Sequence, residues 1–128
     1  MNMQILQTVS TEVERGNMTF PQVVQQLLGI GIESYFVDFA SAQKVYYRAD
    51  GTTHIVPIHL NLKSIAANFS AENLIVAIRG AQGDTLRYPE FVRLSTAAGV
   101  IGYWAFLTGK KVVYFGKKGE MHIEEFPK

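Results

Sequence analysis

Glu120, His122 and Glu124 alternate with apolar residues near the end of the chain. In a β-strand, residues two apart share a face, so these three side chains would project to one side of a sheet. An imidazole between two carboxylates could bind a divalent metal ion or act as an acid–base group. The alternative that we favour is a histidine on the solvent face or a hydrogen-bonded structural histidine, because an earlier segment of similar sequence places His54 at the matching position without either carboxylate. We therefore predict no metal site and no built-in cofactor.

Arg79 and Gln82 stand three residues apart in a segment with helical periodicity, which puts them at neighbouring positions on a helix surface. The planar guanidinium of Arg79 could hold a carboxylate or a phosphate group of a ligand. The alternative that we favour is structural: Arg79 would pair with a carboxylate such as Asp84 or Glu90, or bind a loop carbonyl group. Neither Arg79 nor Gln82 has a copy in the first half of the chain, so both are specific to the second half.

Aromatic residues are concentrated in the segments that we predict as strands. They could line a cleft between the two halves of the chain, a common place for small ligands to bind: Tyr35, Tyr46, Tyr47, Tyr103, Trp104, Tyr114 and Phe115. Aromatic residues at strand spacing serve more often in core and cross-strand packing, and we favour that interpretation.

The composition limits the classes of function. The 128 residues carry a net charge of +1 and are 48% hydrophobic, which is typical of a folded chain near the size of one domain. A charge so close to zero gives no broad field for nucleic acid or an acidic membrane surface, so we expect neither as a partner. The chain has no cysteine, which excludes thiol chemistry, and no apolar segment long enough to span a bilayer. The expected location is the cytoplasm.

The second half of the chain repeats the first. A shift of 68 residues aligns positions 20–55 with positions 88–123 without a gap, and nine of the 36 positions are identical. The identical pairs include Tyr35 with Tyr103, Tyr46 with Tyr114, and His54 with His122. A unit of this size is marginally stable alone, so two copies are expected to share one core. We predict a single domain, residues 1–128, made of repeats at about 1–68 and 69–128.

Each repeat is predicted to contain two helices followed by three strands. Apolar residues at helical spacing, caps at Thr19 and Ser70, and stops at glycine place the helices. Asp50-Gly51 predicts a hairpin with positive φ at both residues, and the strand that contains Pro57 is predicted to end or to lie at an edge there. The expected helices span 4–15, 20–28, 71–81 and 89–98, and the expected strands span 32–39, 44–49, 52–58, 100–108, 111–115 and 120–126. The fold class is α+β, with helices layered on one antiparallel six-stranded sheet or on two closely packed three-stranded sheets.

A resemblance to a known family rests on many small matches in the second half. They are Ala77-Ile78-Arg79-x-x-Gln82, Tyr88-Pro89-Glu90-Phe91, Ala98-Gly99-Val100, Tyr103, Tyr114-Phe115-Gly116, Gly119-Glu120 and Glu124-Glu125-Phe126-Pro127. Over residues 70–127 the chain resembles an uncharacterised bacterial family whose members are often labelled phage-envelope-like proteins. The resemblance implies no particular activity, cofactor or catalytic residue.

These observations lead us to expect a non-catalytic ligand-binding or protein-interaction module. Its partner would be an unknown small molecule or protein, and a second copy of the chain is one candidate. The candidate ligand-binding residues are Arg79, Gln82, Tyr103, Trp104, Tyr114 and His122. The alternative is a small enzyme with a site between the repeats, formed by Arg79, Tyr103, Tyr114 and His122.

Overall fold

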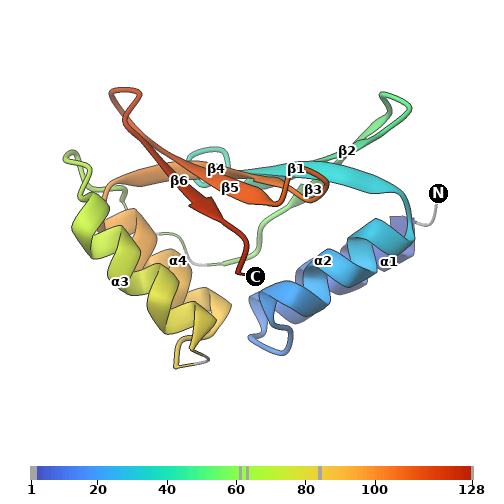
Figure 1. Ribbon diagram of the computed structural model, residues 1–128, viewed down its shortest axis with the longest axis horizontal. Helices are drawn as coiled ribbons and strands as arrows, with labels where there is room; N and C mark the ends of the chain where they lie inside the picture. Colours follow the sequence, from blue (N-terminus) through green and yellow to red (C-terminus); the bar gives the residue numbers. More distant parts are fainter. Residues whose placement is uncertain (1–2, 61, 63, 84, 128) are drawn as a thin grey trace.

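Two helices followed by three strands occur twice along the chain (Figure 1). A computed structural model describes residues 3–60, 62, 64–83 and 85–127. The first repeat contains α1 (Met3–Glu14), α2 (Phe20–Gly29), β1 (Ile32–Asp38), β2 (Gln43–Arg48) and β3 (Thr53–Pro57). The second contains α3 (Ala71–Gln82), α4 (Tyr88–Ala97), β4 (Val100–Phe106), β5 (Lys111–Gly116) and β6 (Met121–Glu125). The predicted α+β fold and its duplicated order of elements are confirmed.

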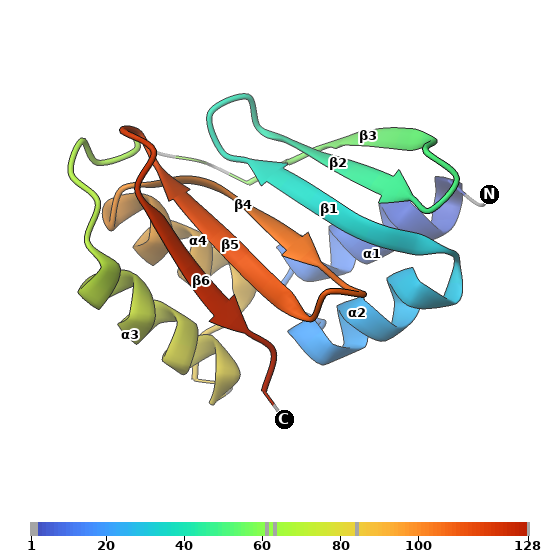
Figure 2. The same cartoon turned by 45° about the horizontal axis from the view of Figure 1, so that its top comes forward.

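All six strands belong to one antiparallel sheet, in the order β3-β2-β1-β4-β5-β6 (Figure 2). The structure thus selects the single six-stranded sheet from the two arrangements that the sequence left open. The first strand of each repeat lies at the centre, where β1 pairs with β4. Apolar residues on both faces of β4 predict such a central position, because neither face of a central strand needs to be polar. The third strand of each repeat lies at an edge.

The two repeats are related by a local two-fold axis through the centre of the sheet. Phe36 pairs with Trp104, its own counterpart after a shift of 68 residues. On either side the pairs are Tyr35 with Ala105 and Val37 with Tyr103, which the same shift exchanges. Within each repeat the register is also the same, since Tyr35 faces Tyr46 and Tyr103 faces Tyr114. The register therefore gives physical support to the duplication.

Local signals at the helix ends act as expected. The side chain of Thr19 accepts a hydrogen bond from the backbone of Gln22, whose own side chain accepts one from Thr19, and together they form a capping box at the start of α2. Ser70 caps α3 through a 3.1 Å hydrogen bond from the Asn73 N–H. Gly31 and Gly99 follow the second helix of each repeat with φ of 85° and 87°. Only glycine adopts this conformation without strain, so the two chain reversals are equivalent.

One prediction about the turns is wrong. In the β2–β3 hairpin Gly51 has a φ of 91°, but Asp50 is not among the described residues with positive φ. The Asp50 carboxylate instead accepts hydrogen bonds from the N–H and the hydroxyl of Thr52. Its short side chain thus completes the turn and does not need a left-handed backbone. The end of β3 at Pro57 is as predicted.

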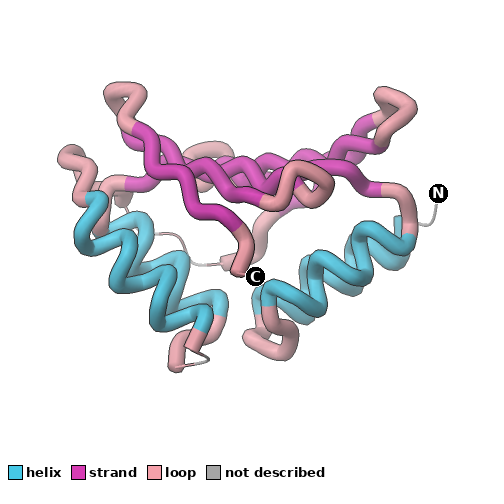
Figure 3. Tube along the Cα trace, viewed as in Figure 1, coloured by secondary structure: helices cyan, strands magenta, loops and turns pink. Residues whose placement is uncertain are grey.

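All four helices cover the same face of the sheet, as Figure 3 shows, and the other face carries no helix. Residues alternate accordingly: Tyr35 and Val37 of β1 are buried on the helix-covered side, whereas Phe36 between them is only half-buried. Leu6 and Leu27 of the first helix pair are fully buried, as is Leu74 of the second pair. No helix within the described part of the chain is long and apolar enough to cross a membrane.

Candidate functional site

A cavity of about 350 Å³ lies beneath the centre of the sheet, between the two helix pairs. Both repeats line it, with side chains from every helix and from strands β1, β2, β4, β5 and β6. Most of the lining is apolar or aromatic, including Val13, Val23, Ile78, Phe91 and Val112. A concave, mainly apolar cavity of this size with a few polar groups is the usual form of a small-molecule site.

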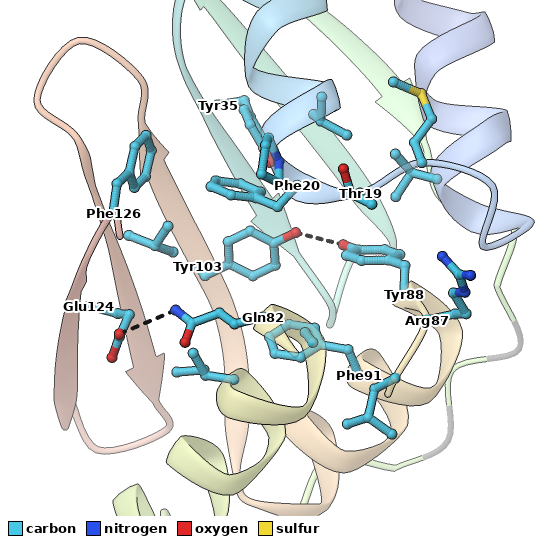
Figure 4. Close-up of a pocket in the computed structure, with 18 of the residues that line it drawn as sticks. Thr19, Phe20, Tyr35, Gln82, Arg87, Tyr88, Phe91, Tyr103, Glu124 and Phe126 are labelled. Atoms are coloured by element: carbon cyan, nitrogen blue, oxygen red, sulfur yellow. Dashed lines mark hydrogen bonds between the residues drawn. The ribbon is translucent and has the colours of Figure 1, made fainter. Parts of the chain in front are cut away.

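Five tyrosines bring both aromatic rings and hydroxyl groups to the wall: Tyr35, Tyr46, Tyr88, Tyr103 and Tyr114. The hydroxyl groups of Tyr88 and Tyr103 lie 2.7 Å apart and form a hydrogen bond that joins α4 to β4 (Figure 4). The Tyr35 and Tyr46 rings are 5.5 Å apart, and the equivalent pair in the second repeat, Tyr103 and Tyr114, is 5.4 Å apart. Tyr88 has no equivalent tyrosine, because the first repeat has Phe20 there.

The environment keeps the five hydroxyl groups neutral. Burial is the main cause in each case, and it raises the pKa of each tyrosine well above the ordinary value of 10.0. The phenolate form is disfavoured because it loses its hydration in the protein interior. At neutral pH these groups can therefore donate hydrogen bonds to a ligand, but they are poor acid–base groups.

Lys44 is the cationic side chain that is buried in the wall of the cavity. It extends from the helix-covered face of β2 and is only 3% exposed. Its Nζ donates a hydrogen bond to Ser10 Oγ at 3.2 Å and lies 5.4 Å from the centre of the Tyr88 ring. Burial lowers the pKa of Lys44 to about 8, although the negative charge of Glu14 acts in the opposite direction. The amine is thus mostly charged at pH 7 and costly to keep buried.

Glu124 organises a second polar group, at the side of the cavity formed by α3 and β6. Its Oε2 accepts a 2.7 Å hydrogen bond from Arg79 and a 3.5 Å one from Gln82, and its Oε1 lies 3.2 Å from His122 Nε2. The Gln82–Glu124 contact is drawn in Figure 4. Partial burial acts to raise the pKa of Glu124, but the hydrogen bonds from Arg79 and His122 outweigh it and hold the pKa below its usual value.

Several candidate residues from the sequence meet in this region. Gln82, Tyr103 and Tyr114 line the cavity, whereas Arg79 and His122 are not among the described residues that line it. Both instead contact Glu124, which does line it. Arg79 thus pairs with a carboxylate of the chain, but with Glu124 of a distant strand and not with its neighbours in sequence. Glu90 pairs with Arg93, and Asp84 lies outside the described residues.

Trp104 lies on the opposite face of the sheet from the cavity. It packs with Tyr47 at 5.4 Å and with Phe36 at 5.3 Å between ring centres, and Phe115 lies on the same face, 6.3 Å from Phe36. The aromatic residues that the sequence analysis grouped into one cleft are therefore divided between two faces. Tyr47, Trp104 and Phe115 each directly follow a cavity tyrosine in the sequence. Successive residues of a strand point to opposite faces, so these three side chains lie on the face away from the cavity.

The hypothetical Glu120-His122-Glu124 group does not form. Glu120 precedes β6 and its side chain turns back to accept a hydrogen bond from the Lys118 N–H. Within the described ranges there is no group of three or more His, Cys, Asp or Glu side chains that could hold a metal ion. His54 lies opposite Tyr46, just as His122 lies opposite Tyr114.

Sequence reasoning missed Lys44, Ser10 and Tyr88, and the repeat contained a signal for each. Lys44 aligns with Val112, Ser10 with Ile78, and Tyr88 with Phe20. In all three pairs one repeat has a polar group where the other has an apolar side chain. Positions where one repeat has a polar residue and the other an apolar one are therefore the signal in the sequence that indicates these three residues.

These features define a two-repeat α+β protein with a ligand-sized aromatic cavity between the repeats. A search of curated proteins finds no match. The chain belongs to the family described as a protein of unknown function (DUF1398), whose model matches residues 7–125. The match supports an uncharacterised domain and extends the expected similarity from residues 70–127 into the first repeat. The family description does not contain the phage-envelope-like label, which is therefore not confirmed.

Proposed function

We propose that this protein is a non-catalytic module that binds a small organic molecule in the cavity between its repeats. The observation that carries the proposal is the cavity of about 350 Å³ with its tyrosine-rich lining. Aromatic rings offer a ligand flat apolar surface, and their hydroxyl groups give direction through hydrogen bonds. The cavity lies between two helix pairs that α1 and α4 bring into contact.

The alternative of an enzyme that uses Arg79, Tyr103, Tyr114 and His122 has less support. Arg79 and His122 share Glu124 as a partner and are not among the described residues that line the cavity, although the His122 ring lies 6.3 Å from the Tyr114 ring. The raised pKa values of Tyr103 and Tyr114 disfavour proton transfer at neutral pH. Binding without chemistry accounts for the same residues with fewer assumptions.

Filling the cavity tests the proposed function. Val23 is buried in the wall, and its counterpart in the second repeat is Phe91, which also lines the cavity. In Val23→Phe the larger ring should occupy part of the ligand space and weaken binding of the neutral probe 2-naphthamide at least about tenfold. Titration calorimetry gives the affinity, with an expected dissociation constant for the unchanged protein on the order of 0.1–1 mM.

Val24→Phe is the matched control, because Val24 is the next residue of α2, is half-buried and does not line the cavity. It should leave binding of the probe nearly unchanged. Backbone NMR shifts caused by 2-naphthamide should centre on the cavity residues. Absence of binding, or shifts confined to the open face of the sheet, would refute the proposed function.

A further inference from the structure

We propose that the cavity selects ligands that carry an acidic group, foremost a carboxylate, which pairs with Lys44 while the apolar body of the ligand lies against the tyrosines. This inference rests on the proposed function, since it specifies which small molecules the same cavity takes. It assigns Lys44 as the polar end of the site and Ser10, which accepts a hydrogen bond from the Lys44 ammonium group, as its positioning residue. The remaining walls would hold the carbon skeleton.

The first argument is that Lys44 has a charge without a counter-charge in contact. Its ammonium group has three N–H donors, and its hydrogen bond among the described residues goes to Ser10 Oγ. None of the ion pairs among these residues includes Lys44. The carboxylate of Glu14 influences it through space but accepts a hydrogen bond from the His59 N–H at 2.8 Å. A buried ammonium with spare donors in the wall of a cavity is a natural partner for an anion.

The second argument is that the fold does not need a lysine here. The equivalent residues of the second repeat, Ile78 and Val112, are buried and line the same cavity with apolar side chains. The same architecture is therefore built in one repeat with an apolar pair and in the other with Ser10 and Lys44. Because the apolar pair avoids the cost of burying a charge, the polar pair in the first repeat is best explained by binding.

The third argument is the distribution of charge around the cavity. The carboxylates of Glu124 and Glu125 line it on the β6 side, and Glu124 is already neutralised by Arg79. An acidic group would be repelled from this side and attracted to the opposite side, where the buried Lys44 and the exposed Arg87 both line the cavity. The Tyr88–Tyr103 hydroxyl pair adds a polar group to the same wall, because the Tyr88 ring lies 5.4 Å from Lys44 Nζ. A ligand would thus have a defined orientation.

Two probes of the same shape test this inference: 2-naphthoate carries a carboxylate, and 2-naphthamide is neutral. Titration calorimetry at pH 7 should show at least about tenfold tighter binding of 2-naphthoate to the unchanged protein, since hydrogen bonds to charged groups are the stronger kind. Lys44→Met should abolish this preference and leave the affinity for 2-naphthamide within about threefold. Lys111→Met, an equal charge change at an exposed residue of β5, should preserve the preference.

The outcomes separate the two proposals. Equal binding of both probes to the unchanged protein, or a preference that survives in Lys44→Met, would overturn the role of Lys44 and leave the cavity as a neutral apolar site. If neither probe binds, the proposed function itself fails and this inference fails with it. Loss of the preference in Lys111→Met would attribute it to the overall charge of the protein and would also overturn the inference.

A different observation, the open face of the sheet, carries a second inference. One row of side chains crosses all six strands on this face, and every member is apolar: Ile55, Val45, Phe36, Trp104, Val113 and Ile123. Tyr47, Phe106 and Phe115 extend the row on the same face. At its two ends Ile55 and Ile123 are 59% and 54% exposed. Soluble proteins rarely leave so large an apolar surface uncovered.

We infer that this face binds the same face of a second copy of the chain. Six strands spaced about 4.8 Å apart, each five to seven residues long, give a flat area of roughly 500 Å² per copy. Two such faces together bury about 1,000 Å², without counting the added surface of the projecting side chains, and this meets the lower threshold for a biological interface. A two-fold dimer through this face would place the same row of apolar side chains on both sides of the interface, as an isologous contact does.

The oligomeric state tests this second inference. Sedimentation equilibrium at on the order of 100 µM should show a dimer for the unchanged protein and a monomer for the double variant Ile55→Lys, Ile123→Lys, because four charges would then face one another across the interface. The control is Leu28→Lys, Val76→Lys, which replaces exposed apolar residues of α2 and α3 and should remain dimeric. A monomeric unchanged protein, a dimeric sheet-face variant or a monomeric control would each refute it.

Discussion

Replacing Lys44 with methionine is expected to stabilise the folded protein at pH 7. Lys44 is 3% exposed, and burial lowers its pKa from 10.5 to about 8, so folding must pay for an ammonium group that water would solvate better. This shift corresponds to about 2–3 kcal/mol in the free energy of unfolding, after allowing for the lost hydrogen bond to Ser10. Urea unfolding of the two proteins, followed by circular dichroism, measures the difference.

The pH dependence identifies the cause. The unfolded chain keeps the Lys44 proton up to about pH 10.5, whereas the folded chain releases it near pH 8. Between these values the unfolded chain binds more protons, so the stability of the unchanged protein should rise with pH from about 8 to 10. Other groups near the amine are Glu14 of α1, Tyr46 of β2 and Tyr88 of α4. The rise should be absent in Lys44→Met.

A methionine variant that is less stable than the unchanged protein at pH 7 would contradict the prediction, because it would show that Lys44 stabilises the fold. The expected combination, higher stability with weaker binding of acids, is characteristic of residues kept for function. Lys111→Met again serves as the control and should change the stability by less than about 0.5 kcal/mol, since Lys111 is exposed.

Raising the pH above 10 should have the largest effect on stability. Burial raises the pKa of five tyrosines, so the folded chain keeps protons that the unfolded chain loses near pH 10.0. The stability they support is present below pH 10 and falls above it, by as much as about 7 kcal/mol per pH unit once all five are ionised in the unfolded chain. For a domain of ordinary stability this predicts cooperative unfolding between about pH 11 and 12.

Absorbance of tyrosinate near 295 nm and far-ultraviolet circular dichroism should change together in this transition. Tyr114→Phe removes one of the five groups, and should reduce the slope by about 1.4 kcal/mol per pH unit. Gradual ionisation of the five tyrosines near pH 10 with the helices and strands intact would contradict the prediction. It would show that water reaches the cavity wall freely.

The sequence predicted the elements well because their signals are local. Thr19, Ser70 and the glycines after each second helix mark helix ends through hydrogen bonds and backbone conformation within a few residues. The turn at Asp50 is the exception, because Asp-Gly is compatible with more than one turn geometry and the sequence does not distinguish them. The nine identities between the repeats also predict that the helices and strands of one half correspond to those of the other.

The candidate site was predicted less completely. Arg79, Gln82 and His122 were identified by type, but their common partner Glu124 follows from the packing of α3 beside β6. Trp104 was grouped with the cavity tyrosines although it lies on the other face of the sheet. The sequence does not distinguish Lys44, because there it is an ordinary lysine at the start of a strand.

The sequence by itself determined the α+β class, the duplication and the order of helices and strands in each repeat. These properties depend on hydrogen bonds, backbone conformation and side-chain periodicity over short distances along the chain. Only the tertiary structure decided that β1 pairs with β4 in a single sheet and that all four helices cover one face. That choice places the face with the four strand tyrosines beneath the helices and buries Lys44 beside Ser10, a contact between residues more than 30 positions apart. The energy of such contacts depends on burial, which no local pattern in the chain specifies.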